Sequence, residues 1–114
     1  MGSSKLRELS VEFSVAVLQF ADEIKGHYSI VNQLERSATS IGANIHEANY
    51  AHSRADFKTK FEIALKECYE TEYWLEILTK SGLADASGLS ALSDRCGTIR
   101  RLLVASLTTL KNNS

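Results

Sequence analysis

Hydrophobic residues recur along this chain at steps of three and four positions, which is the spacing of one face of an α-helix. Four segments show this pattern, and they predict helices at about 4–25, 29–51, 53–81 and 87–111. In the first segment the apolar face consists of Leu6, Leu9, Phe13, Val17, Phe20 and Ile24. No stretch alternates with the period of two that is typical of a β-strand, so the pattern predicts an all-α protein.

The other three segments carry comparable apolar faces. The second face consists of Ile30, Leu34, Ala38, Ile41, Ile45 and Ala48. The third consists of Phe57, Phe61, Ala64, Leu65, Cys68 and Leu75. The fourth consists of Leu89, Leu92, Cys96, Ile99, Leu103 and Leu110. Long amphipathic helices with short connections favour antiparallel neighbours, so we expect one domain over residues 1–114, an up-down-up-down antiparallel four-helix bundle.

The third helix has local signals at both ends. Ser53 is a good N-cap residue, and Asp56 follows three positions later, as in a short variant of the capping box. Gly82 suits the left-handed position that often follows the last helical turn. These residues predict a helix that begins after Ser53 and ends before Gly82.

Two apolar stripes remain after the predicted core is filled. On the first helix the stripe is Val11, Val15 and Leu18, nearly opposite the main face. On the third helix it is Ile63, Trp74 and Ile77. Large leftover apolar faces are typical of contacts between subunits, so we predict a homo-oligomer. The alternative is a wide core that absorbs both stripes.

Composition and charge narrow the class of protein. The chain has 114 residues with 13 basic and 14 acidic side chains, and its net charge is -1. This balance disfavours strong nucleic-acid binding but leaves room for a local basic patch. The sequence shows neither a long apolar run nor a charged leader, so we expect a cytoplasmic protein that does not bind membranes. Cys68 and Cys96 form no CxxC motif and lie on core faces, so we expect reduced, inert thiols.

The histidines of the stretch IGANIHEANYAH resemble a metal site only at first sight. A zinc protease helix needs two histidines four positions apart. His46 and His52 are six apart, which turns them about 120° from each other on a helix. No Glu-x-x-His of a di-iron bundle occurs in the chain either. With no phosphate-binding loop or nucleophile motif, we expect no metal, no cofactor and no enzymatic activity.

Two stretches carry a family resemblance: QLERSATSIGANIHEA at 33–48 and ADFKTKFEIALKECYETEYWLEIL at 55–78. They resemble the bacterial four-helix bundle proteins encoded in intervening sequences of 23S ribosomal RNA genes. Spaced polar positions match as well as apolar ones, namely Arg36, Ser37, Ser40, Asn44, Glu47, Glu67, Glu70, Thr71 and Glu72. One departure is Gly42, where many relatives have proline.

The resemblance implies a left-handed four-helix bundle and, commonly, a homopentameric ring. It also implies kinship with the accessory variability proteins of diversity-generating retroelements, which form a pentameric barrel and associate with a reverse transcriptase and with nucleic acid. Most intervening-sequence proteins themselves have no established activity. The resemblance therefore favours an oligomeric scaffold or adaptor, with RNA or a reverse-transcriptase-like protein as partner.

The polar residues of the resemblance form a candidate site, composed of Arg36, Ser40, Asn44, Glu47, Glu67 and Glu72. Helical spacing allows a ladder of hydrogen bonds from Arg36 through Ser40 and Asn44 to Glu47. Glu72 faces the core side and needs a cation, for which Arg100 is the better placed; Arg36 is expected to reach a neighbouring subunit. The network either fixes helix register and subunit contacts or contacts a ligand.

Basic residues supply candidate nucleic-acid contacts: Arg54, Lys58, Arg95, Arg100 and Arg101. In one subunit they point in different directions and resemble an ordinary solvated surface. In a ring each small patch is repeated around the axis, which raises the local potential for a phosphate backbone. The preferred hypothesis is a non-enzymatic oligomeric scaffold that contacts RNA or DNA, and the alternative is a protein-interaction module without a nucleic-acid role.

Overall fold

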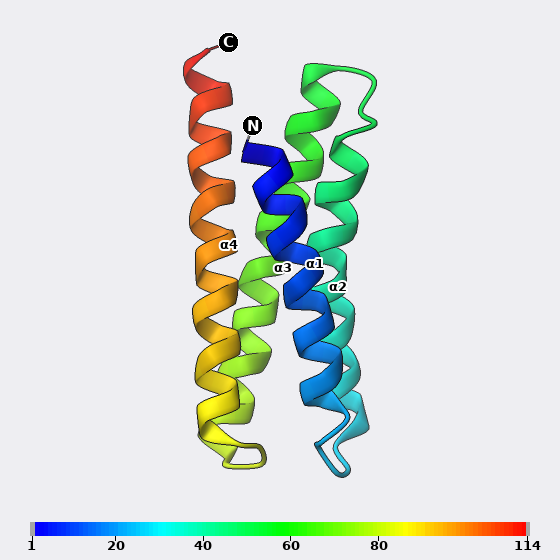
Figure 1. Ribbon diagram of the computed structural model, residues 1–114, viewed down its shortest axis with the longest axis vertical. Helices are drawn as coiled ribbons and strands as arrows, with labels where there is room; N and C mark the ends of the chain where they lie inside the picture. The colour runs from blue at the N-terminus through cyan, green and yellow to red at the C-terminus, as the bar shows by residue number, and fades with distance from the viewer. Residues whose placement is uncertain (1, 114) are drawn as a thin grey trace.

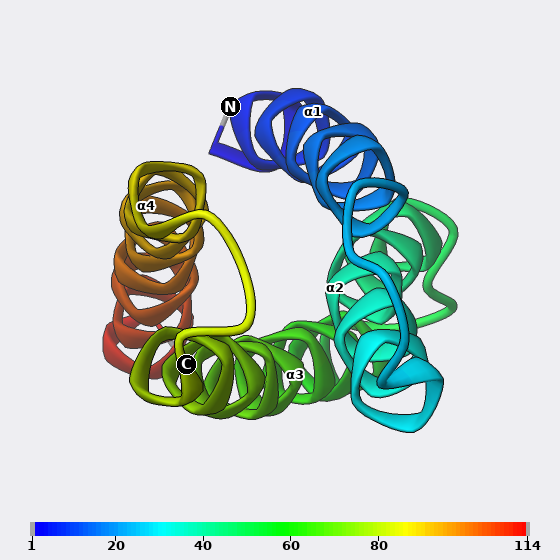
Figure 2. The same ribbon diagram turned by 90° about the horizontal axis from the view of Figure 1, so that it is seen from below.

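The structure, a computed structural model, describes residues 2–113 and contains four helices over that range (Figure 1). They are α1 (Gly2–Ala21), α2 (Tyr28–Ala48), α3 (Arg54–Ser81) and α4 (Ala86–Asn112). Each helix packs against its neighbours in the chain, and α4 also packs against α1, so the four close into a bundle (Figure 2). The predicted all-α, up-down-up-down architecture is confirmed.

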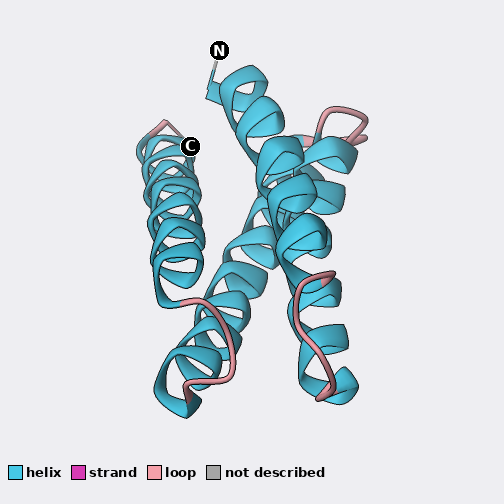
Figure 3. Cartoon of the chain, turned by 60° about the horizontal axis from the view of Figure 1, so that its bottom comes forward, coloured by secondary structure: helices cyan, strands magenta, loops and turns pink. Residues whose placement is uncertain are grey.

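The bundle is a narrow rod with principal extents of 46 × 20 × 19 Å. The connections α1–α2 and α3–α4 lie at one end, and α2–α3 lies at the other (Figure 3). At 20 residues α1 is shorter than α4 at 27, and the C-terminal part of α4 extends beyond the start of α1 (Figure 1). None of the helices in residues 2–113 is long and apolar enough to cross a membrane.

The first two helices are shorter than the apolar pattern predicts. α1 ends at Ala21 rather than near Lys25, because the chain turns through two residues with positive φ, Gly26 at 79° and His27 at 54°. Ile24 nevertheless stays buried, so it continues the apolar pattern from within the turn. At the end of α2, hydrogen bonds from each amide to the carbonyl three residues earlier replace the α-helical pattern over residues 49–51.

The predicted ends of α3 are confirmed in detail. The Ser53 hydroxyl accepts a hydrogen bond of 3.0 Å from the amide of Asp56. The Asp56 carboxylate accepts a hydrogen bond of 3.3 Å from the amide of His52. The reciprocal bond of the capping box is therefore made to the residue before the N-cap. Gly82 has a φ of 70°, as a left-handed C-terminal residue should.

The predicted apolar faces form the core. Most of their residues are buried, with Phe13 and Phe61 the largest of the fully buried side chains. A second group is half-buried and packs on the edge of the core: Leu9, Phe20, Ile30, Phe57 and Leu65. Three polar residues are also buried, Ser10, Ser37 and Thr71, and the apolar pattern gave no signal for them.

Two glycines permit close approaches between helices. A Cβ atom on Gly42 of α2 would lie 3.3 Å from the Ser10 hydroxyl oxygen of α1, so these two small residues let the helices come together. A Cβ atom on Gly88, in the first turn of α4, would lie 2.5 Å from Cε1 of Phe20. The Phe20 ring therefore covers the start of α4 only because Gly88 has no side chain.

Candidate functional site

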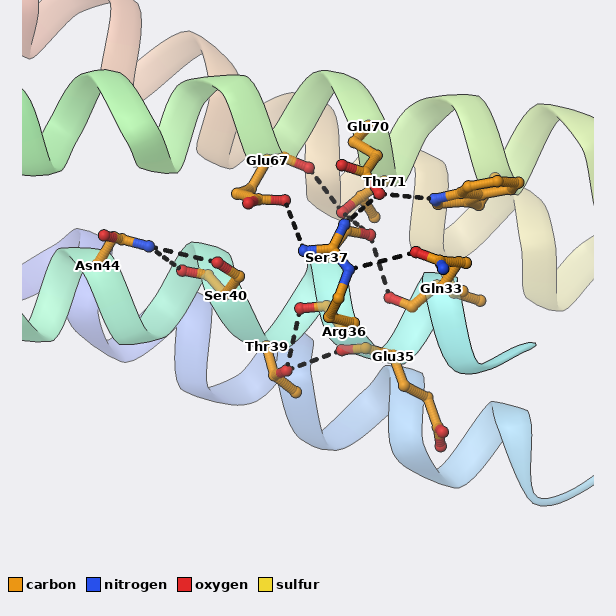
Figure 4. Close-up of polar contacts among 12 residues, drawn as sticks. Gln33, Glu35, Arg36, Ser37, Thr39, Ser40, Asn44, Glu67, Glu70 and Thr71 are labelled. Carbon is orange, nitrogen blue, oxygen red and sulfur yellow. Dashed lines mark hydrogen bonds and ion pairs between the residues drawn. The ribbon is translucent and has the colours of Figure 1, made fainter. Parts of the chain in front are cut away.

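Polar residues of α2 and α3 meet along the outer side of the contact between these helices (Figure 4). The Arg36 guanidinium makes a short hydrogen-bonded ion pair with the Glu70 carboxylate and lies 3.5 Å from Oε1 of Glu67. The hydrogen bond from Arg36 lowers the pKa of Glu70, and the same bond raises the pKa of Arg36. The sequence predicted that Arg36 reaches a neighbouring subunit. In the structure its side chain pairs with α3 of the same chain instead.

Two further side chains hold this ion pair in place. The Arg36 Nε donates to the amide oxygen of Gln33 at 3.2 Å, one turn earlier on α2. The Trp74 indole donates to the Glu70 carboxylate at 3.1 Å, one turn later on α3. We call Gln33, Arg36, Glu67, Glu70 and Trp74 the α2–α3 polar network. Glu70 and Gln33 were not among the predicted site residues, because their roles depend on how α2 and α3 are rotated toward each other.

Glu67 is the most buried carboxylate of the network, with 16% of its side chain exposed. Its Oε1 atom faces the Arg36 guanidinium but has no hydrogen-bond partner among the described residues. A buried carboxylate oxygen without a hydrogen bond costs free energy, so the charge of Arg36 is needed at this position. Glu67 thus depends on Arg36 more than Glu70 does, because the Glu70 side chain is 35% exposed and also accepts a hydrogen bond from Trp74.

Beneath the network, two buried hydroxyl groups join α2 to α3. The Thr71 hydroxyl oxygen lies 2.8 Å from the Ser37 hydroxyl oxygen and 2.8 Å from the carbonyl oxygen of Glu67. The Ser37 hydroxyl in turn lies 3.3 Å from the carbonyl oxygen of Leu34. These bonds satisfy both hydroxyl groups inside the core and fix the register of the two helices.

The predicted ladder along α2 is present in part. The Asn44 amide donates to the Ser40 carbonyl at 2.9 Å and lies 3.3 Å from the Ser40 hydroxyl, as expected. The neighbouring members bind across to α3 instead: Arg36 as described above, and Glu47 to the Lys60 ammonium at 2.9 Å. The hydrogen bond that Lys60 donates to the Glu47 carboxylate raises the pKa of Lys60. The polar band of α2 therefore serves the α2–α3 contact.

Glu72 lies on the opposite side of α3 and pairs with α4. Its two carboxylate oxygens accept from the Arg100 Nε at 3.1 and 3.0 Å, which confirms the predicted partner. Both side chains are about 30% exposed, and the hydrogen bond that Arg100 donates to Glu72 raises the pKa of Arg100. Glu72 is thus separate from the α2–α3 polar network, although the sequence placed it in one candidate set with Glu67.

The five predicted nucleic-acid residues do not form one patch in the described chain. Arg54 donates to the carbonyl of Leu110 at 2.9 Å, which joins the start of α3 to the end of α4. Lys58 lies one turn further along α3. On α4, Arg95 lines a cavity with α1, Arg100 is paired with Glu72, and Arg101 donates to the Thr98 hydroxyl at 3.3 Å.

The predicted subunit-contact residues divide into two groups. Val11, Val15 and Leu18 on α1 are 56%, 47% and 44% exposed. On α3, Ile77 is exposed, whereas Ile63 and Trp74 are half-buried. Trp74 packs on the core edge and binds Glu70, so part of the α3 stripe is used within the chain, as the wide-core alternative expects. The α1 stripe packs against no comparable partner among the described residues.

The three histidines lie at exposed positions, and the two cysteines are buried. His46 packs edge-on against Tyr50, with ring centroids 5.5 Å apart. Both cysteines are buried free thiols, and the Cys96 sulfur lies 3.6 Å from the carbonyl oxygen of Cys68. The contact with Cys68 and burial raise the pKa of Cys96, which keeps this thiol protonated and a poor nucleophile. Within residues 2–113 no three metal-binding side chains gather into a group that could hold an ion.

The 23S rRNA-intervening sequence protein family model matches residues 3–105. The chain belongs to this family. It is also similar to a crystal structure of a protein with unknown function from the S23 ribosomal protein family of Bacteroides thetaiotaomicron. The two chains are 36% identical and superpose with a TM-score of 0.88, over 95% of this chain and 99% of the other. No curated protein matches the chain.

Family membership extends the resemblance seen in α2 and α3. The matched range also contains α1 and most of α4, where the sequence showed only a similar length and pattern. The solved member of the S23 family is itself described as having unknown function. Family membership thus agrees with the fold of this intervening-sequence family protein but assigns no function. The function has to be argued from the protein's own surface.

Proposed function

We propose that this intervening-sequence family protein is a non-enzymatic homo-oligomer, with five subunits favoured, that acts as a scaffold for a nucleic-acid-containing partner. The observation that supports it most is the exposed apolar stripe of α1, Val11, Val15 and Leu18. Three neighbouring aliphatic side chains on one helix face leave apolar area in water that a second subunit covers favourably. A scaffold needs such self-association more than it needs a reactive group.

The chemistry of the described residues supports a non-catalytic role. The carboxylates nearest the core, Glu67 and Glu72, each pair with an arginine of the same chain. A catalytic acid or base needs to exchange its proton with a substrate, whereas these groups are engaged in holding helices together. The raised pKa of Cys96 argues in the same direction for that thiol.

Mass measurement in solution tests the oligomer. Light scattering on protein eluted at micromolar concentration should give a mass several times the 12.6 kDa of one chain, and about five times that value for the favoured pentamer. If the measured mass is that of one chain at all micromolar concentrations, the scaffold proposal is wrong. Val11→Ser/Val15→Ser should lower the mass, because the exposed stripe loses most of its apolar area.

Arg95 and Arg101 are the arginines best suited to reach a phosphate backbone. Arg100 is held by Glu72 and Arg54 by a backbone carbonyl, whereas Arg95 and Arg101 are exposed and paired with no carboxylate in the described contacts. Repetition around a ring would bring several copies of each residue to one nucleic acid.

Salt-dependent binding of structured RNA tests this contact. Wild-type affinity should fall steeply as salt is raised from about 50 to about 200 mM, since each phosphate contact releases counterions. Arg95→Glu/Arg101→Glu should abolish binding, and Lys5→Glu/Lys25→Glu is a control with the same change in net charge at exposed positions. Equal loss in both variants would mean that only overall charge matters.

The second candidate is a protein-interaction module without a nucleic-acid role. The observation in its favour is that Arg36, Arg54 and Arg100 are all engaged within the chain. It predicts an intact oligomer that binds no RNA even at about 50 mM salt. That result would keep the scaffold and remove the nucleic-acid partner.

A further inference from the structure

A shallow groove lies between the outer sides of α3 and α4, near the end where α4 terminates. Its volume is about 410 Å³. Three aliphatic side chains line it, Leu65 of α3 with Val104 and Leu107 of α4. Lys58, Glu62, Thr108 and Lys111 surround these residues. We call this the α3–α4 groove, and we call Val11, Val15 and Leu18 the α1 ridge.

The groove and the ridge cannot meet within one chain. α1 packs against α2 and α4 but is not a neighbour of α3, and the ridge points away from its own core face of Leu6, Phe13 and Val17. The bundle seen along its axis has α1 and α3 at diagonal positions (Figure 2). Any contact between ridge and groove therefore involves two copies of the chain.

The two surfaces match in length and in charge. Val11 to Leu18 and Lys58 to Leu65 are each seven residues apart, which is about 10 Å along a helix. Acidic residues outnumber basic ones beside the ridge, where Glu8 and Glu12 stand with Arg7. Basic residues outnumber acidic ones around the groove, where Lys58 and Lys111 stand with Glu62. Such complementarity sets orientation and disfavours contact between like surfaces.

We propose that the α1 ridge of one copy docks in the α3–α4 groove of the next. This inference rests on the proposed self-association and specifies how it occurs. A contact between two different surfaces is heterologous, so it repeats head to tail and closes into a ring when the rotation allows. It also places Lys58 in the subunit contact, which leaves Arg95 and Arg101 as the exposed arginines for a partner.

Two single variants test the pairing of the surfaces. Val15→Glu puts a charge on the ridge and Val104→Glu puts one in the groove, at residues 47% and 41% exposed, so the isolated fold should tolerate both. Leu83→Glu is the matched control, because Leu83 is 46% exposed in the α3–α4 connection and belongs to neither surface. Circular dichroism should show unchanged helix content in all three variants.

The expected result is that Val15→Glu and Val104→Glu are each monomeric by light scattering, while the control keeps the wild-type mass. A 1:1 mixture of the two monomeric variants should form a species of twice the monomer mass, since one retains an intact groove and the other an intact ridge. If both variants keep the wild-type mass, or dissociate but do not combine, the ridge–groove pairing is overturned while self-association stands. A monomeric wild type would instead overturn the proposed function itself.

Discussion

At the scale of single residues, the buried hydroxyl groups of Ser37 and Thr71 depend on each other. Ser37→Ala should lower the free energy of unfolding by about 0.5–1.5 kcal/mol, and not more, because Thr71 keeps its bond to the carbonyl of Glu67. Thr71→Val should cost less when added to Ser37→Ala than it does alone, since the contact between the two hydroxyl groups is already gone and only the bond to the Glu67 carbonyl is lost. Urea denaturation measures all three variants, with the exposed Ser90→Ala as control. Strictly additive costs would show that the two groups do not interact.

The Arg36–Glu70 ion pair predicts a pH-dependent contribution to stability. Arg36 holds the pKa of Glu70 below its usual range, so the pair stabilises the fold above the unfolded pKa of about 4.3 and loses this effect as pH falls through the lower, folded value. Glu70→Gln should therefore destabilise the protein by up to about 1 kcal/mol at pH 7, as exposed pairs do, and by much less near pH 3. Urea unfolding of the wild type and of Glu70→Gln at both pH values measures this difference in the free energy of unfolding. A pH-independent cost would mean that shape, not charge, matters at this position.

The residue scale also shows what helical spacing can and cannot predict. It placed Glu72 and Arg100 on the facing sides of α3 and α4, and the ion pair is there. It misplaced Arg36, because a long side chain reaches around its helix to Glu70 by an amount that depends on how the helices are rotated. Helical spacing did not predict that Ser37 and Thr71 are buried, since polar residues are usually exposed, and the two residues stood out only through the family resemblance.

At the scale of helices, two glycines of α4 should respond oppositely to alanine. Gly88→Ala places a Cβ atom against the Phe20 ring, which must move, so we expect a loss of about 1–3 kcal/mol in the free energy of unfolding. In Gly97→Ala the new atom meets only the far ends of two long side chains, Arg101 at 3.2 Å and Arg100 at 3.5 Å, which can shift slightly, so the better helix propensity should add up to about 1 kcal/mol. Thermal unfolding followed by circular dichroism compares the two. If both variants lose stability equally, the Phe20 contact is not the cause.

The ends of the helices show what apolar periodicity can and cannot predict. The pattern located all four helices and the caps located both ends of α3, because Ser53 and Gly82 act through local hydrogen bonds and backbone angles. The apolar pattern predicted too long a helix for α1. Ile24 lies in the turn after the helix, but it is buried at the position where another helical turn would have placed it. Periodicity records which side chains are buried, and a turn can satisfy it as well as a helix.

At the scale of the whole molecule, the proposed self-association through the α1 ridge predicts that thermal stability depends on protein concentration. Unfolding of an oligomer releases free chains, so raising the concentration tenfold adds up to about 1.4 kcal/mol per chain and should raise the midpoint by up to roughly 6 °C. Val15→Glu removes the association while its site is exposed in the single chain, so its midpoint should not vary with concentration. Scanning calorimetry of both proteins over a hundredfold range measures the difference. The same midpoint at every concentration of the wild type would mean that the bundle alone provides the stability, and that the ridge is covered by a partner other than a second copy.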